Sequence, residues 1–241
     1  MSRLLIICSC FSLTCLIANS QTTVDVDKEG GARGAVFKYV YTVAGTPFVT
    51  AKFAKVVEGS PFFNEQMMRG AIILSEGKEY RNILVRLNLL ESQVNYIDEK
   101  QIEMIATTPI SEVVLWDTIN NDHHRFVFSN YIETTDKPDK DFYELLLTGK
   151  VELYKQHKKK ILESKPYGSA TVEQSIKTEL RYFVLSSGKW IRIKKIKELT
   201  DLLVDKKNEI QKLIVDKNLT KDSEANFETI VAYYNTLASQ Q

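Results

Sequence analysis

The strongest metal-binding candidates in the sequence are three consecutive residues, Asp122, His123 and His124. Carboxylate oxygens and imidazole nitrogens are ordinary ligands of Zn²⁺. Neighbouring side chains on a strand point to opposite faces, however, so the two histidines can chelate one ion only from a loop. The third histidine, His157, is far away in the sequence. We therefore interpret the triplet as part of a solvated loop and assign no metal-ligating residue.

A Gly-Lys pair follows an apolar run at three places, residues 77–78, 149–150 and 188–189. A phosphate-binding loop requires G-x-x-x-x-G-K followed by Ser or Thr, and then a helix whose N-terminus holds the phosphate. None of the three lysines is followed by Ser or Thr. Glycine does supply the positive φ that a tight hairpin requires. The pattern predicts three β-hairpins, and we assign no cofactor-binding residue.

The residue types give little support for nucleophilic catalysis. The cysteines, Cys8, Cys10 and Cys15, all precede residue 20, and no G-x-S-x-G nucleophile elbow is present. Carboxylates are abundant, but the sequence does not show which of them lie together. We assign no catalytic residue, and a hydrolase that uses carboxylates on a sheet stays open as the alternative function.

The elements that would position any site are mostly β-strands. Charged residues make up 26% and apolar residues 44% of the chain, as in ordinary globular proteins. Roughly ten short segments with β-prone or alternating composition follow one another with short connections and no long helix between them. They lie at residues 35–43, 71–74, 80–90, 94–98, 102–106, 110–116, 125–131, 142–147, 151–154, 180–185 and 190–193. This pattern predicts an antiparallel meander that forms a curved sheet, a sandwich or an incomplete barrel.

The last part of the chain changes to a helical period. Apolar residues recur at three- and four-residue spacings through 196–238, which predicts about three short helices, each with one apolar stripe. Asp205 is a candidate cap for the middle helix, and Asp222 or Ser223 for the last. A single stripe must be covered, so we expect residues 196–241 to pack on the β domain at 35–195.

The first twenty residues resemble a secretory signal peptide. Arg3 precedes a mostly apolar run at 4–18, and the small residues Ala18 and Ser20 predict cleavage after Ser20. The run is shorter than the roughly 20 residues that span a bilayer, although an anchor or a lipidated cysteine is the alternative. A polar leader, 21–34, follows. Without Arg3 the chain has 31 basic and 31 acidic residues, so its net charge does not favour nucleic acid.

Two basic stretches are candidates for contact with phosphate groups. Residues 155–160 read K-Q-H-K-K-K, and residues 192–197 read R-I-K-K-I-K. We interpret both as solvated strand faces, because the second alternates with apolar isoleucines and the mature chain is neutral. If either stretch binds phosphate, a peripheral membrane contact is the expected use, given the signal peptide.

Several longer stretches resemble a known group of proteins. They are V-V-E-G-S-P-F-F-N-E-Q-M-M-R-G-A-I-I-L at 56–74, Y-R-N-I-L-V-R-L-N-L-L-E-S-Q-V-N-Y-I-D at 80–98, P-I-S-E-V at 109–113, D-K-K-N-E-I-Q-K-L-I-V at 205–215 and V-A-Y-Y-N-T-L at 231–237. Together they resemble uncharacterised secreted proteins of Bacteroidetes. The resemblance implies a bacterial origin and a periplasmic or extracellular location, and it supplies no activity and no site residue.

These observations predict a mainly β protein of the bacterial envelope. We expect a non-catalytic binding module or a structural accessory protein, whose partner is an envelope protein or a small ligand. We expect no nucleic acid partner and no transmembrane segment in the mature chain.

Overall fold

The computed structural model describes residues 23–25, 43–48, 54–136, 138–165, 167 and 172–239. The predicted signal peptide, its cleavage site and the β-prone segment up to residue 42 lie outside the described residues. Within the predicted leader, Thr23–Asp25 forms a short strand, β1, that pairs in parallel with β5.

A single open sheet of thirteen strands is the largest part of the described chain, with 48% of it in strands, and this confirms the predicted fold class. Its main path runs β13-β12-β11-β10-β9-β8-β4-β5-β6-β7-β2, and all pairs along it are antiparallel. The meander is interrupted twice, where β8 returns to pair with β4 instead of β7 and where β2 pairs with β7. The strands are β2 (Gly45–Pro47), β3 (Ala54–Glu58), β4 (Met68–Leu74), β5 (Glu79–Asn88), β6 (Gln93–Ile97), β7 (Glu103–Ala106), β8 (Ile110–Asp117), β9 (Asp122–Phe128), β10 (Phe142–Leu147), β11 (Val151–Ser164), β12 (Val172–Ser186) and β13 (Lys189–Ile193).

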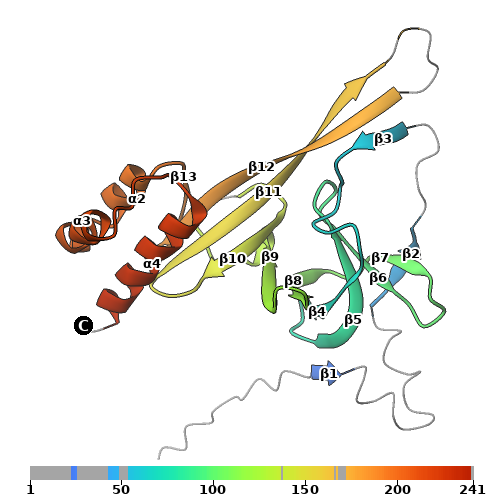
Figure 1. Ribbon diagram of the computed structural model, residues 1–241. Coiled ribbons are helices and arrows are strands. Elements are labelled where there is room, and N and C mark those ends of the chain that lie inside the picture. The colour runs from blue at the N-terminus through green and yellow to red at the C-terminus, as the bar shows by residue number, and fades with distance from the viewer. Residues whose placement is uncertain are drawn as a thin grey trace, which may run out of the picture.

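Strands β11 and β12 are far longer than the sequence predicted. They pair continuously from Val151 opposite Ser186 to Ser164 opposite Glu173. The predicted strands stopped at 154 and began at 180, because the charged residues between were not recognised as part of a ladder. Figure 1 shows this β11–β12 ribbon running from the C-terminal helices to a tip that projects beyond the sheet, where β3 pairs in parallel with β12.

Three helices follow the sheet, as predicted. They are α2 (Ile196–Leu202), α3 (Lys207–Asp216) and α4 (Glu224–Ala238), with a 3-10 turn, η4 (Val204–Lys206), between α2 and α3. Another 3-10 turn, η3 (Ser129–Tyr131), lies between β9 and β10. The predicted cap Asp205 is wrong, since α3 begins after Lys206 and the Asp205 carboxylate instead accepts a hydrogen bond of 3.1 Å from the Tyr234 hydroxyl. Ser223 is the N-cap residue of α4 by position, but its side chain makes no capping hydrogen bond.

The helices cover one face of the sheet at β11–β13. Four apolar side chains of α4 are almost fully buried there. They join residues of the three strands, of α2 and its C-cap and of α3 in one core: Val151, Leu153, Val184, Ile193, Leu199, Leu203, Ile210, Phe227, Ile230, Val231 and Tyr234. A second core lies among β4–β10, and a third lies on the opposite face of β10–β13. Because large side chains of α4 leave water only by this packing, the helix is docked intramolecularly.

The three Gly-Lys pairs lie in hairpin turns, as predicted. Gly77, Gly149 and Gly188 have φ values of 84°, 149° and 76° in the turns β4–β5, β10–β11 and β12–β13. The turn at Gly149 is also held by Asn235 of α4, whose side-chain amide bonds both the N–H and the carbonyl of Val151 at 3.0 and 2.8 Å.

Candidate functional site at the base of the ribbon

A buried carboxylate, Glu144, is the centre of the most concentrated group of ionisable side chains. His124 Nδ1 lies 2.6 Å from its Oε1, while His157 Nε2 and Lys155 Nζ lie 2.7 and 2.9 Å from its Oε2. The Glu144 side chain is only 5% exposed. We call these four residues the Glu144 cluster.

The register of three neighbouring strands brings the cluster together. Glu144 of β10 is directly opposite Phe126 of β9 and Lys155 of β11. Residues two apart on a strand share a face. His124 therefore projects on the same side as Phe126, and His157 on the same side as Lys155, so both histidines reach the carboxylate between them.

The cluster continues to the first residue of α4. Lys155 Nζ also lies 2.9 Å from Oε1 of Glu224, and the Tyr182 hydroxyl donates a hydrogen bond of 2.8 Å to the other oxygen of Glu224. The network thus links β9, β10, β11 and β12 to the N-terminus of α4. On the other side, the Phe63 ring packs edge-on against His124 and His157, with centroids 4.9 and 5.3 Å away.

The ionisation of the cluster is set by competition between burial and hydrogen bonds. Burial by itself raises the pKa of Glu144, but hydrogen bonds from His124, His157 and Lys155 outweigh it and hold the pKa far below its ordinary value. The hydrogen bond to Glu144 raises the pKa of His124. Burial lowers the pKa of Lys155, yet Glu144 and Glu224 raise it more. The favoured state at neutral pH is a carboxylate surrounded by charged or polar donors.

The arrangement is not that of a metal site. Among the described residues no group of three or more His, Cys, Asp or Glu side chains is placed to hold a metal ion. The Lys155 ammonium already supplies a cation beside Glu144.

The interpretation of residues 122–124 as a solvated loop is wrong here. His124 belongs to strand β9 and is not in a solvated loop, and His157, far away in sequence, lies against the same carboxylate. His123 does stay exposed. Sequence reasoning missed Glu144 entirely. The available signal was an acid alone in an apolar strand, with Lys155, the first residue of the basic stretch 155–160, placed opposite it across the predicted hairpin at Gly149.

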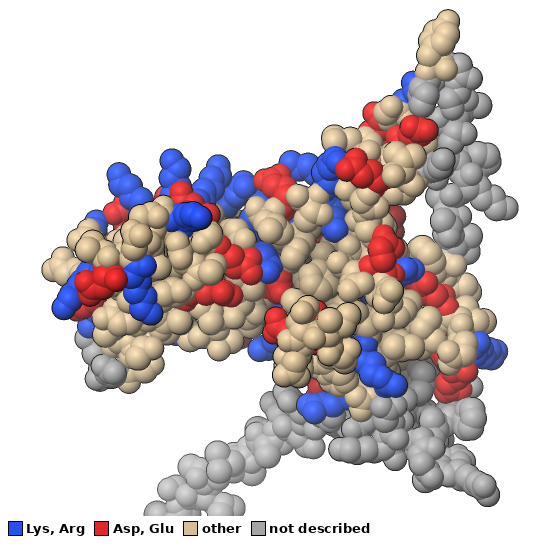
Figure 2. Space-filling view, in the orientation of Figure 1, with Lys and Arg blue, Asp and Glu red and all other residues tan. Residues whose placement is uncertain are grey.

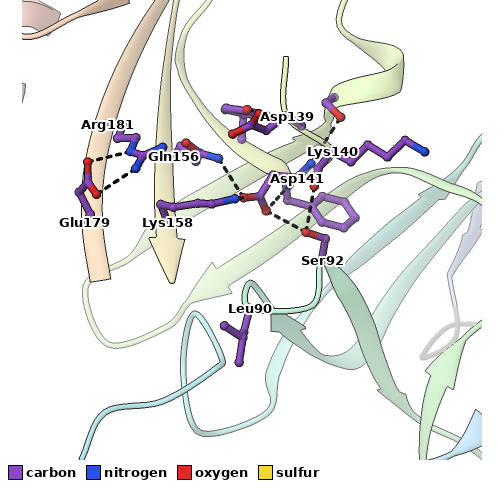
Figure 3. Close-up of polar contacts among 12 residues, drawn as sticks. Leu90, Ser92, Asp139, Lys140, Asp141, Gln156, Lys158, Glu179 and Arg181 are labelled. Atoms are coloured by element: carbon purple, nitrogen blue, oxygen red, sulfur yellow. Dashed lines mark hydrogen bonds and ion pairs between the residues drawn. The ribbon is translucent and has the colours of Figure 1, made fainter. Parts of the chain in front are cut away.

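A second buried carboxylate, Asp141, lies near the opposite face of the ribbon (Figure 3). It is 2% exposed and accepts hydrogen bonds from the Ser92 hydroxyl at 3.0 Å, the Gln156 amide at 2.9 Å and the Phe142 backbone N–H at 2.9 Å. Lys158 Nζ lies 3.4 Å from the same carboxylate. These contacts tie β10 and β11 to the turn that carries Ser92.

Farther along the same face, an exposed carboxylate collects three cations. Glu179 of β12 pairs with Arg181 at 2.8 Å, Lys160 at 2.7 Å and Arg192 at 3.2 Å. The hydrogen bonds from Arg181 and then Lys160 hold its pKa well below the ordinary range. Its side chain is 37% exposed, so solvent screens these pairs much more than those of Glu144.

The interpretation of 155–160 as a solvated strand face holds for only part of the stretch. Lys160 is exposed, but Lys155 and Gln156 are buried and His157 is largely covered. The reason is their place on β11 between β10 and β12, where Glu144 and Asp141 supply the acceptors.

Three cavities lie in the described part of the chain, and one of them, of about 180 Å³, adjoins Asp141, since it is lined by Ser92 and Phe142, which both donate hydrogen bonds to that carboxylate. A polar cavity of about 370 Å³ lies between the Gly149 and Gly188 turns, lined by Glu112, Arg125 and Glu152 among others. A smaller one, of about 270 Å³, lies beside Tyr96. Neither is lined by Glu144 or Asp141.

Comparison of the chain with protein-family models, curated proteins and solved structures gives no match. The resemblance to secreted proteins of Bacteroidetes therefore stays a prediction. None of the helices in the described ranges is long and apolar enough to cross a membrane.

Proposed function

We propose that the protein is a non-catalytic binding or accessory module of the bacterial envelope, exported by a signal peptide that is cleaved after Ser20. The contacts of the buried carboxylates support a non-catalytic role. The envelope location and the cleavage after Ser20 are supported by the sequence alone.

The observation that carries the proposal is that the two buried carboxylates are already surrounded by hydrogen-bond donors of the protein. A general acid or base must reach its substrate and exchange a proton near the working pH. Glu144 is enclosed by His124, His157 and Lys155, and its pKa is held far below that range. Asp141 is enclosed in the same way by neutral donors and Lys158. Both carboxylates hold elements of the fold together, and neither is among the residues that line the cavities described above.

One observation favours the alternative of a hydrolase. The hydrogen bond between His124 Nδ1 and Glu144 is the kind that orients a catalytic imidazole for proton transfer through its other nitrogen. The His124 side chain is 21% exposed, so part of the ring meets solvent. In this alternative His124, and not a carboxylate of the sheet, is the acid–base residue.

Activity assays separate the two functions. The full chain is tested against chromogenic esters, phosphate esters, glycosides and peptides, together with the variant His124→Asn. The proposal expects no turnover above that of buffer. Turnover that the variant loses while its thermal melt stays cooperative would establish the hydrolase and refute the binding module.

Export has its own test. Mass spectrometry of the secreted or periplasmic protein is expected to give a chain that begins at Gln21. A chain that retains Arg3, or one that carries a lipid on a cysteine, contradicts this part of the proposal.

A further inference from the structure

Positive charge is concentrated in the three strands at one end of the sheet. Residues 155–197 contain 12 Lys and Arg but only three Asp and Glu, whereas the whole chain has a formal charge of +1. This segment runs from the fifth residue of β11 through β12 and β13 to the second residue of α2. The rest of the chain has more acidic than basic residues, so the positive charge is concentrated at the end of the sheet that carries this segment.

Part of this charge is neutralised by acids from elsewhere in the fold. Lys155 pairs with Glu144 and Glu224, Lys158 with Asp141, and Lys177 with Glu58. These pairs account for cations that point toward the sheet or across the ribbon. They do not involve the cations at the outer edge.

The outer edge carries a row of exposed cations that we call the basic ridge. It consists of Lys189 and Arg192 on β13 and of Lys194, Lys195 and Lys197 at the start of α2, all exposed. Within the described residues only Arg192 of these five forms an ion pair, with Glu179. Figure 2 shows a row of Lys and Arg side chains along this upper edge of the molecule, over β13 and α2.

Besides Glu179, three carboxylates lie close to the ridge, and these three are bound to its backbone. Asp136, Glu198 and Asp222 accept hydrogen bonds of 2.7, 2.7 and 2.8 Å from the N–H groups of Trp190, Lys194 and Ile196. They fix the path of the segment and leave the lysine side chains directed to solvent. The outermost layer of the ridge is therefore positive, while its acids lie against the backbone.

Protection of a sheet edge explains only part of the ridge. Lysines on an edge strand prevent pairing with other chains, which accounts for Lys189 and Arg192 on β13. Lys194, Lys195 and Lys197 follow the end of the strand at Ile193 and protect no ladder.

We propose that the basic ridge binds a membrane surface rich in anionic phospholipid. The proposal rests on the proposed function and names a partner for the binding module. Charge complementarity carries it, because lysines held near a surface are attracted to anionic headgroups without a dedicated pocket. A single-stranded nucleic acid also needs exposed rings for its bases. The one aromatic residue of this strand, Trp190, instead stacks on Phe183 with centroids 5.1 Å apart and packs against Tyr143.

Vesicle sedimentation tests the proposal with the full chain. Vesicles contain either phosphatidylcholine alone or phosphatidylcholine mixed with phosphatidylglycerol, at low and high salt. We expect binding only to the mixed vesicles and release by salt. The variant with K194Q, K195Q and K197Q is expected to bind on the order of 100-fold more weakly, because each lysine contributes about 1 kcal/mol.

A matched control has K100Q, K140Q and K217Q, which make the same change in net charge at exposed lysines away from the ridge. Its affinity for mixed vesicles is expected to change by less than about threefold, since only screened long-range charge is lost. Thermal melts of both triple variants should match that of the parent chain.

Three results would overturn the inference: no binding to mixed vesicles at low salt, equal weakening in the two triple variants, or equal affinity of the parent chain for duplex DNA and for mixed vesicles. Each result leaves the proposed function standing unless the activity assays also find a reaction that depends on His124. A His124-dependent reaction refutes the proposed function whatever the vesicles show.

Discussion

Replacing Glu144 by Gln removes one charge from the middle of a buried network while keeping the size of the side chain. The carboxylate has three donors within 2.9 Å. The amide that replaces it has only one acceptor oxygen, and its NH₂ group must face a donor. The Lys155 ammonium then has only Glu224 as a carboxylate partner.

The expected loss of unfolding free energy depends on which partners remain for each hydrogen-bond donor after the substitution. Hydrogen bonds to charged groups contribute about 1.5–3 kcal/mol each, so three of them set an upper limit. The loss is smaller than that limit because Lys155 keeps Glu224 and both histidine rings have partial access to water. Removing one partner of a buried charge pair typically costs about 3–5 kcal/mol. We expect Glu144→Gln to lower the free energy of unfolding by an amount in that range.

Urea denaturation at neutral pH, followed by tryptophan fluorescence, measures the change. The matched control is Glu179→Gln, which also removes a carboxylate with three nitrogen-bearing partners, but from an exposed position. Its effect should be far smaller, because water screens exposed pairs. A loss below about 1 kcal/mol for Glu144→Gln, or equal losses for the two variants, would show that burial does not strengthen the cluster.

Three further predictions concern pH, the last helix and a hairpin turn. The pKa of His124 is raised from 6.5, so its contribution to stability is fully present below pH 6.5 and is lost as the pH rises through the folded-state pKa. Urea midpoints measured below and above this range should show the loss of stability, and His124→Asn should abolish this pH dependence. Truncation after Lys217 should lower the melting temperature sharply, because four buried side chains of α4, each contributing about 1.5–3 kcal/mol, leave the core; coincident melts would place the helix on a partner instead. Gly149→Ala should destabilise more than Gly77→Ala in thermal melts, since a Cβ at Gly149 strikes the Asn235 amide whereas one at Gly77 meets open space; equal melts would contradict this.

Local signals were sufficient for the turns and for the class of fold. Gly77 and Gly188 were recognisable because a tight hairpin needs a residue that tolerates positive φ, and this requirement is written within four or five neighbouring residues. The helical stripe that contains Phe227 and Ile230 was recognisable in the same way, from spacing alone. Both features depend on short stretches of chain.

The Glu144 cluster was hidden because its members meet only through the register of three strands. His124 and His157 approach one another across β10, and no local spacing records that pairing. The length of the ribbon was missed for a related reason. Lys158 and Lys160 appear solvated when taken alone, yet their backbones continue a ladder whose partner strand begins beyond a turn. Strand composition reflects its neighbours more than intrinsic preference.

The contacts of α4 with β11 determine the order in which the protein can mature. Asn235 holds the Val151 backbone, and Glu224 holds Lys155, across 84 and 69 positions of sequence. A chain that emerges N-terminus first at about 5–20 residues per second presents the uncovered face of β11 for on the order of 10 s before α4 appears. During that interval the apolar side chains of Leu153 and Val184 are not yet covered by the helices. Chains halted before residue 224 therefore leave this apolar face exposed to water, a condition that promotes aggregation.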